Sequence, residues 1–184
     1  DFLMAAQSLT VEEARTEIIE CARYGEIDAV RAILDIWSKS EKEDLMVDSR
    51  DALSGSTALH KSAANNHVST TALLLSRGAK HVTNNNGNTP LHWGAAAGHY
   101  DIVKLLLQNE RLNQEGLDVL LKNNFGRGAL TEGFSSQKTE VTGLLLEHDS
   151  AEEDKLINGG DGICKQVDAD EIHCDNDNNN NTTL

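Results

Sequence analysis

The sequence predicts an all-α solenoid of about four helix-turn-helix units, and two observations support this prediction. The first is internal repetition: SGSTALHKSAANNHVSTTALLL at 54–75 aligns with NGNTPLHWGAAAGHYDIVKLLL at 86–107, which places Thr57 and Thr89 in register, 32 residues apart. The second is composition. Hydrophobic residues make up 39% of the chain and aromatic residues only 4%, with a single proline, which favours helices packed on alanine and leucine.

The second of these strings shows how each repeat forms two helices. Thr89 stands at the N-cap position and Pro90 in the first turn, where a helix tolerates proline. The small residues at 95–97 allow close packing of a second helix, and Gly98 supplies a left-handed residue that ends the first. Apolar residues at helical spacing over 102–106 predict that second helix. Because both flanks of such a unit are apolar, single units are unstable and must stack.

Two weaker copies flank these units. TEIIECARYGEIDAVRAIL at 16–34 keeps only the apolar and glycine positions, and FGRGALTEGFSSQKTEVTGLLL at 125–146 loses the threonine and the histidine. The sequence therefore predicts one repeat domain over 11–149. Its units are expected at about 15–37, 53–80, 86–109 and 125–148.

The irregular spacing of the units predicts two insertions. They fall at 38–50 and 109–121, and each is either a binding loop at one edge of the stack or a tolerated surface loop. Ser40 and Glu43 stand in capping-box register and predict a helical turn in the first insertion.

Both ends of the chain differ from the repeats. We expect a flexible N-terminus over 1–10 and a short exit helix over 150–158, opened by a capping box of Ser150 and Glu153. Residues 159–184 are rich in acidic residues, glycine and asparagine, and are expected to form a disordered acidic tail.

These strings resemble the ankyrin repeat, whose signature is D-x-x-G-x-T-P-L-H-x-A-A-x-x-G-H followed by an apolar helix. The resemblance covers about 16–148 and is strongest in the third unit. It implies hairpin-like loops between the units and structural roles for the histidines, which hydrogen-bond between adjacent units. The motif residues to which it gives structural roles are Thr57, His60, Thr89, Pro90, His92, Gly98 and His99.

The resemblance also implies where a partner binds, because ankyrin proteins usually grip partners with hairpin tips and the exposed side of each first helix. Tyr24, Phe125 and Arg127 are the expected anchors, since exposed aromatic residues and arginine are enriched at interface hot spots. Trp93 is either core packing or a partner contact. In this sequence the hairpin tips and the exposed sides of the first helices correspond to Arg23, Tyr24, Leu53, Ser54, Ser56, Ala64, Asn65, Asn85, Asn86, Asn88, Ala96, Ala97, Asn124, Phe125, Arg127, Ser135 and Ser136.

The charge of the chain narrows the class of partner. The net charge is −14, and the last 34 residues alone carry a net −7. An acidic surplus disfavours nucleic acid and anionic membranes, which need clustered lysine and arginine, and favours a basic protein. The acidic tail either screens such a partner or only keeps the protein in solution. We expect a monomer.

Cysteine usage and apolar runs indicate the compartment. An odd number of cysteines, three, does not make a disulfide framework, so the cytoplasm, the nucleus or both are expected. No apolar run reaches the length that spans a bilayer, and residues 1–10 lack the features of a signal peptide.

Motifs for catalysis and for cofactor binding are missing from the sequence. It contains no H-E-x-x-H, no paired C-x-x-C, no glycine-rich phosphate loop and no G-x-S-x-G, so we expect no enzyme activity and no cofactor. Cys164, His173 and Cys174 are three zinc-type ligands without a fourth, and we expect free thiols and no metal. Cys21 is expected to be a small buried hydrophobic residue.

Two hypotheses on function follow. The acidic first unit, the TPLHW unit, the NNFG string at 123–126 and the acidic tail resemble small ankyrin chaperones that shield a basic ribosomal protein on its way to the nucleus. Alternatively, 123–156 is similar to the last repeat and exit helix of proteins in which ankyrin repeats precede an S-adenosylmethionine-dependent protein methyltransferase domain. The chain itself lacks the glycine motif that binds this cofactor, and its start at Asp1 fits a fragment of such a protein.

Overall fold

The computed structural model describes residues 8–37, 46–148 and 151. Several predictions lie outside these residues. They concern residues 1–7 of the N-terminus, the Ser40–Glu43 capping box, the exit helix, the acidic tail, and Cys164, His173 and Cys174.

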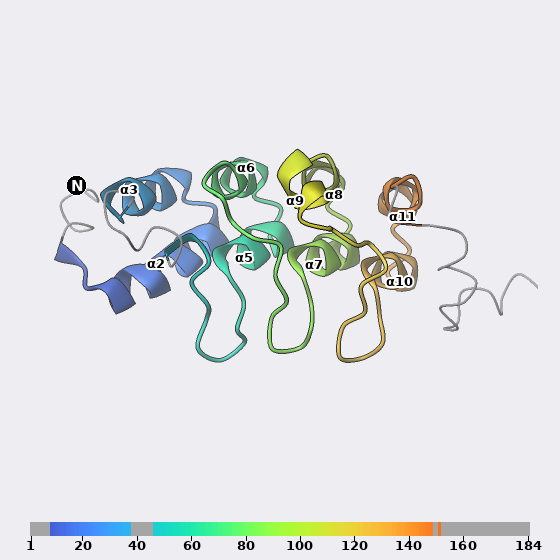
Figure 1. Ribbon diagram of the computed structural model, residues 1–184, viewed down its shortest axis with the longest axis horizontal. Coiled ribbons are helices and arrows are strands. Elements are labelled where there is room, and N and C mark those ends of the chain that lie inside the picture. Colours follow the sequence, from blue (N-terminus) through green and yellow to red (C-terminus); the bar gives the residue numbers. More distant parts are fainter. Residues whose placement is uncertain (1–7, 38–45, 149–150, 152–184) are drawn as a thin grey trace, which may run out of the picture.

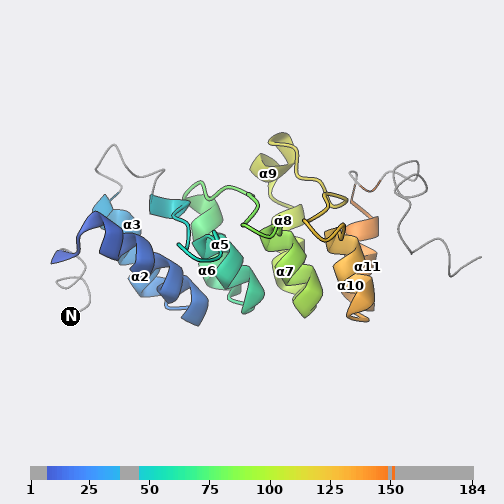
Figure 2. The same ribbon diagram turned by 90° about the horizontal axis from the view of Figure 1, so that it is seen from below.

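The described residues form two rows of helices, which confirms the predicted all-α solenoid. An inner row of one helix per unit packs side by side along the molecule, and an outer row packs behind it (Figures 1 and 2). The inner row consists of α2 (Val11–Tyr24), α5 (Ala58–Ala64), α7 (Pro90–Ala97) and α10 (Ala129–Ser135). The outer row consists of α3 (Ile27–Trp37), α6 (Val68–Ser76), α8 (Tyr100–Leu107) and α11 (Thr139–Leu146).

A hairpin loop precedes each of α5, α7 and α10 and projects to one side of the inner row (Figure 1). In the described residues these loops contain no strand, only an isolated antiparallel bridge between Arg50 and Thr57. One continuous core runs between the rows, so each unit depends on its neighbours, as expected of a solenoid. No helix within the described ranges is long and apolar enough to cross a bilayer.

The first inner helix begins earlier than the repeat register indicates. Thr10 caps α2, with its backbone N–H donating to Glu13 Oε2 at 2.8 Å and its Oγ1 accepting from Glu13 N at 3.3 Å. Thr16, in register with the capping residue Thr57, lies inside the helix and donates its hydroxyl to Glu12 O at 3.1 Å. The capping box at Thr10 is a complete local start signal, and it extends α2 by more than one turn.

The turn between the two helices of a unit needs a left-handed residue. Gly98 fills this position after α7 with φ 78°. Asn66 and Gln137 take the same conformation after α5 and α10, with φ 61° and 57°. Asparagine tolerates this region better than most side chains, so unit two keeps the turn without glycine.

The second insertion packs against the stack. It contains a short helix, α9 (Glu110–Gln114), capped by Asn109 Oδ1, which accepts from Leu112 N at 3.1 Å. Leu112 is buried, and the Arg111 guanidinium donates to Ala79 O of the preceding unit. This part of the insertion therefore stabilises the outer row.

Candidate functional site

An acidic or amide residue at the base of each hairpin binds backbone N–H groups of its tip, and the first hairpin closes one residue later than the other two. Asn84 Oδ1 accepts from the backbone N–H groups of Asn86 and Asn88, both at 3.0 Å. Asn123 Oδ1 accepts from the amides two and four residues ahead in the third hairpin, again at 3.0 Å. Asp51 Oδ1 accepts from the amide two residues ahead in the first hairpin. These local bonds hold each tip in one conformation.

Neighbouring tips are also bonded to each other. Asn85 donates its backbone N–H to Ser54 O and its side-chain amide to Leu53 O, both at 3.0 Å. Asn124 repeats this one unit further on, donating to Asn86 O and Asn85 O, both at 3.0 Å. The tips therefore form a continuous row, and Asn85 and Asn124 hold it together while remaining exposed.

The motif histidines join α5 and α7 to the hairpins that follow them. His60 Nδ1 accepts from Thr57 N at 3.1 Å, so Nε2 carries the proton and donates to Asn88 O at 2.9 Å. His92 makes the same pair of bonds, from its own capping threonine and to Arg127 O at 3.0 Å. The fourth unit has threonine at this position, so the series of bridges ends there.

A second pair of histidines joins each unit to the one before it. His67 Nε2 donates to Arg23 O at 2.9 Å, and His99 Nε2 donates to Ala64 O at 3.0 Å. In the fourth unit Lys138 stands at this position, and its aliphatic chain lies against Gly98. Histidine hydrogen bonds therefore link α5 to the third unit at both of its ends.

Burial keeps the motif histidines neutral. It lowers the pKa of His60 to about 4 and lowers the pKa of His92. Their ring nitrogens are occupied by hydrogen bonds, which leaves no lone pair for a metal or a substrate. No group of three His, Cys, Asp or Glu side chains in the described residues could hold a metal ion. Burial also raises the pKa of the Cys21 thiol to about 12, so it stays protonated at neutral pH.

Large apolar side chains stand exposed along the hairpin tips and the inner row. Leu53 is 90% exposed at the first tip and Phe125 is 69% exposed at the third. Tyr24 is exposed at the end of α2, with the Arg23 guanidinium 6.0 Å from its ring centroid. Exposed side chains of this size on a rigid scaffold are candidates for contact with a partner.

The other expected contact residues divide into exposed and buried positions. Ser56 is fully buried and does not face a partner: its hydroxyl accepts from Asn84 Nδ2 at 3.2 Å and joins the two hairpins. Ser54 and Asn88 are half-buried, as are Ala64, Ala96 and Ser136. The exposed ones are Arg23, Asn65, Asn85, Asn86, Ala97, Asn124, Arg127 and Ser135.

Trp93 both packs and faces outward at the centre of the inner row. It is half-buried, with its ring edge-on to His60 at a centroid distance of 5.6 Å. Lys61 Nζ lies 5.7 Å from the Trp93 ring centroid. Lys61 and Glu132 occupy the register position of Trp93 in units two and four, and the sequence analysis did not name them as possible contact residues. The repeat register could have identified them, because each stands one residue after the position of the motif histidine, as Trp93 does.

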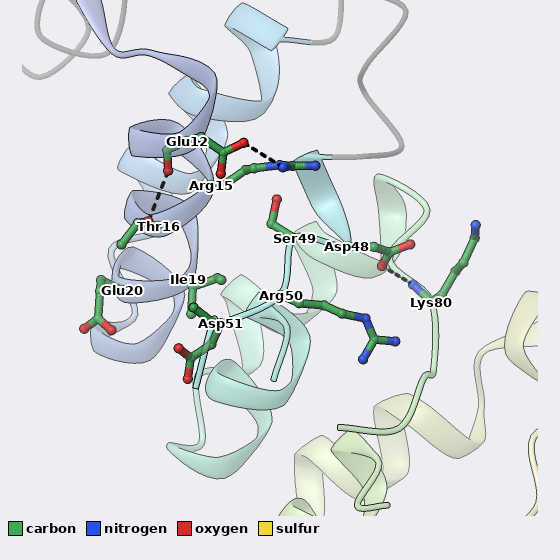
Figure 3. A pocket seen from close by; sticks show the side chains of 11 residues that line it. Glu12, Arg15, Thr16, Ile19, Glu20, Asp48, Ser49, Arg50, Asp51 and Lys80 are labelled. Carbon is green, nitrogen blue, oxygen red and sulfur yellow. Dashed lines mark hydrogen bonds and ion pairs between the residues drawn. The ribbon is translucent and has the colours of Figure 1, made fainter. Parts of the chain in front are cut away.

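A pocket of about 600 Å³ lies between α2 and the first hairpin (Figure 3). Figure 3 shows Ile19, Glu20 and Asp51 at one end of it and the charged ends of Arg50 and Lys80 at the other. The pocket is of mixed charge, with acidic and basic side chains in its lining. Its lining residues are Glu12, Arg15, Thr16, Ile19, Glu20, Asp48, Ser49, Arg50, Asp51, Ala52 and Lys80.

Comparison with known proteins identifies this architecture. A family model described as "Ankyrin repeats (3 copies)" matches residues 18–116. The ankyrin repeat-containing protein YAR1 of Saccharomyces cerevisiae is 32% identical over 155 residues, which are 78% of this chain and 74% of that protein. A solved structure of the yeast ribosomal protein Rps3 in complex with its chaperone Yar1 aligns with TM-score 0.64 and 32% identity, covering 78% of this chain and 97% of that chain.

For other relatives the aligned part covers less than half of the relative's own length. The putative ankyrin repeat protein FPV031 of Fowlpox virus is 29% identical over 76% of this chain, which spans 39% of that protein. A probable E3 ubiquitin-protein ligase of Oryza sativa, XBOS32, is 33% identical over 46% of this chain and 16% of its own length. The names of these relatives give no support to the methyltransferase alternative.

Proposed function

Since this chain belongs to the ankyrin-repeat family, we propose that it is a non-catalytic protein-binding module that escorts a basic ribosomal protein. The observation that carries the proposal is the rigid row of hairpin tips with Leu53 and Phe125 exposed. Tip conformation is held by bonds within and between hairpins, so a partner binds without the cost of ordering flexible loops. The Yar1 chain that aligns over nearly its whole length is, in that structure, bound to Rps3.

Charge supports a basic client. The chain carries a net −14, and α2 presents Glu12 and Glu13 in its first turn, with the half-buried Glu20 further along the helix towards the pocket. Ribosomal proteins carry clustered lysine and arginine for RNA, and an acidic chaperone attracts such a surface at long range. We expect a monomeric chaperone that works in the cytoplasm, the nucleus or both.

The tips can be tested directly by replacing both exposed apolar anchors. The double variant Leu53→Asp, Phe125→Asp should bind the counterpart of Rps3 from the same organism about 30-fold more weakly than the wild type, since buried apolar anchors dominate interface energies. Titration calorimetry at 150 mM salt measures this affinity.

Tyr100→Asp is the matched control, because Tyr100 is an exposed aromatic at the start of α8 in the outer row. It should leave the affinity within about twofold of the wild type. Equal losses in both variants would place the binding surface elsewhere, and no binding by the wild-type protein would rule out this client.

A further inference from the structure

The fourth unit, the last one described, exposes apolar side chains at two positions that are buried in units two and three. Phe134 in α10 is 45% exposed, whereas the residues at the same register position in units two and three, Ala63 and Ala95, are 0% exposed. Leu146 in α11 is 44% exposed, whereas its register counterparts Leu75 and Leu107 are 5% and 7% exposed. Phe134 lies on an inner helix and Leu146 on an outer helix, so both helices of the fourth unit expose an apolar side chain at a position that is buried in units two and three.

The cause is the position of the unit at the end of the described stack. Units two and three have a neighbour on both sides, and α10 and α11 have a described neighbour only on the side of α7 and α8. A solenoid normally ends in a unit whose outer face is polar, because no further unit covers it. Here the end face exposes Phe134 and Leu146, and such an apolar face is typical of a surface that another element covers.

The chain that follows α11 supplies a suitable cover. Ala151 is half-buried against the core, and its N–H donates to His148 O at 2.8 Å, so the chain stays on the stack where the described residues end. The next residues read EEDKLI, and Leu156 and Ile157 are the first apolar pair after Ala151. Five residues span about 7 Å as a helix and about 17 Å when extended, which is within reach of the adjacent end face.

We propose that Leu156 and Ile157 pack on Phe134 and Leu146 and close the end of the stack in place of a further repeat. The same segment contains the acidic residues Glu152, Glu153 and Asp154, which have the polar character that the exterior of a terminal unit requires. The contact stabilises the fourth unit, which lacks the capping threonine and the bridging histidine of units two and three.

A double-mutant cycle in the full-length chain tests this contact. Leu156→Ser should raise the unfolding equilibrium constant about tenfold in the wild type, as expected for a leucine that loses about half of its burial. In a Phe134→Ser background the same change should have less than a twofold effect, because its contact is already gone. Urea unfolding followed by circular dichroism gives the constants. Leu146→Ser is a second background for the cycle.

Phe125→Ser is the matched control, since Phe125 is an exposed phenylalanine at a hairpin tip rather than on the end face. In that background Leu156→Ser should keep its tenfold effect. An equal effect of Leu156→Ser in all backgrounds, or no effect in the wild type, would overturn the proposal. So would a dimer in sedimentation analysis that Phe134→Ser dissociates, because a second copy would then cover the end face.

Discussion

Replacing His60 by alanine is expected to lower the free energy of unfolding by about 3 kcal/mol at pH 7.5, which urea denaturation measures directly. The side chain is fully buried and bonded at both ring nitrogens, to Thr57 N within its own unit and to Asn88 O in the next hairpin. Alanine leaves a buried donor and a buried acceptor without partners, and it opens a cavity next to Trp93.

His67→Ala is the matched control for this prediction. His67 also bridges two units, with Nε2 donating to Arg23 O at 2.9 Å, but that bond is exposed to water, which can replace the lost partner. Its loss should cost less than about 1 kcal/mol. Equal losses in the free energy of unfolding for the two variants would show that the contribution of His60 to stability does not depend on its burial.

Acidification from pH 7.5 to pH 5.0 is expected to destabilise the protein by at least about 2 kcal/mol, through the buried histidines. Burial lowers the pKa of His60 to about 4 and of His81 to about 3, and it also lowers that of His92. His81 Nε2 is buried without a hydrogen-bond partner among the described residues, so it gains nothing from protonation there.

The direction of the pH effect follows from which state takes up protons. In the unfolded chain these histidines titrate near pH 6.5. In the folded protein burial lowers the pKa of all three, so that His60 stays neutral down to about pH 4. Their contribution is complete above pH 6.5, and each loses up to about 1.4 kcal/mol per unit as the pH falls below that value. The lowered pKa values of Glu13 and Asp51 act only below this window.

Urea midpoints at half-unit intervals from pH 7.5 to pH 5.0 give the slope. The His60→Ala variant should show a shallower slope than the wild type, because it has one titrating group fewer. A wild-type midpoint that stays constant over this range would contradict the neutral, buried assignment of the histidines.

The repeats themselves were readable from the sequence because each position carries a local requirement. Thr89, Pro90 and Gly98 mark the start and the end of one helix, and the structure places α7 from Pro90 to Ala97 between them. Aligning the other units with this one predicted their helix boundaries as well, including those of the fourth unit, in which the threonine and the histidine are replaced. Period and pattern together were sufficient for the all-α solenoid.

Features that depend on neighbouring elements were not readable. Ser56 was expected at the surface, but an amide from the next hairpin buries it. Thr16 stood in register with Thr57, yet the stronger capping box at Thr10 starts α2 earlier. The exposure of Phe134 depends on what stands next to the fourth unit, which a repeat pattern does not encode. Each of these is decided by three-dimensional packing rather than by local sequence.

Hydrogen–deuterium exchange of the protein with and without the counterpart of Rps3 from the same organism tests the central claim most directly. The account predicts slower exchange in the three hairpins, at 51–57, 84–89 and 123–128, and unchanged exchange in the outer helices α3, α6 and α8. Slower exchange confined to the outer helices, or none in any segment at saturating concentrations, would contradict it.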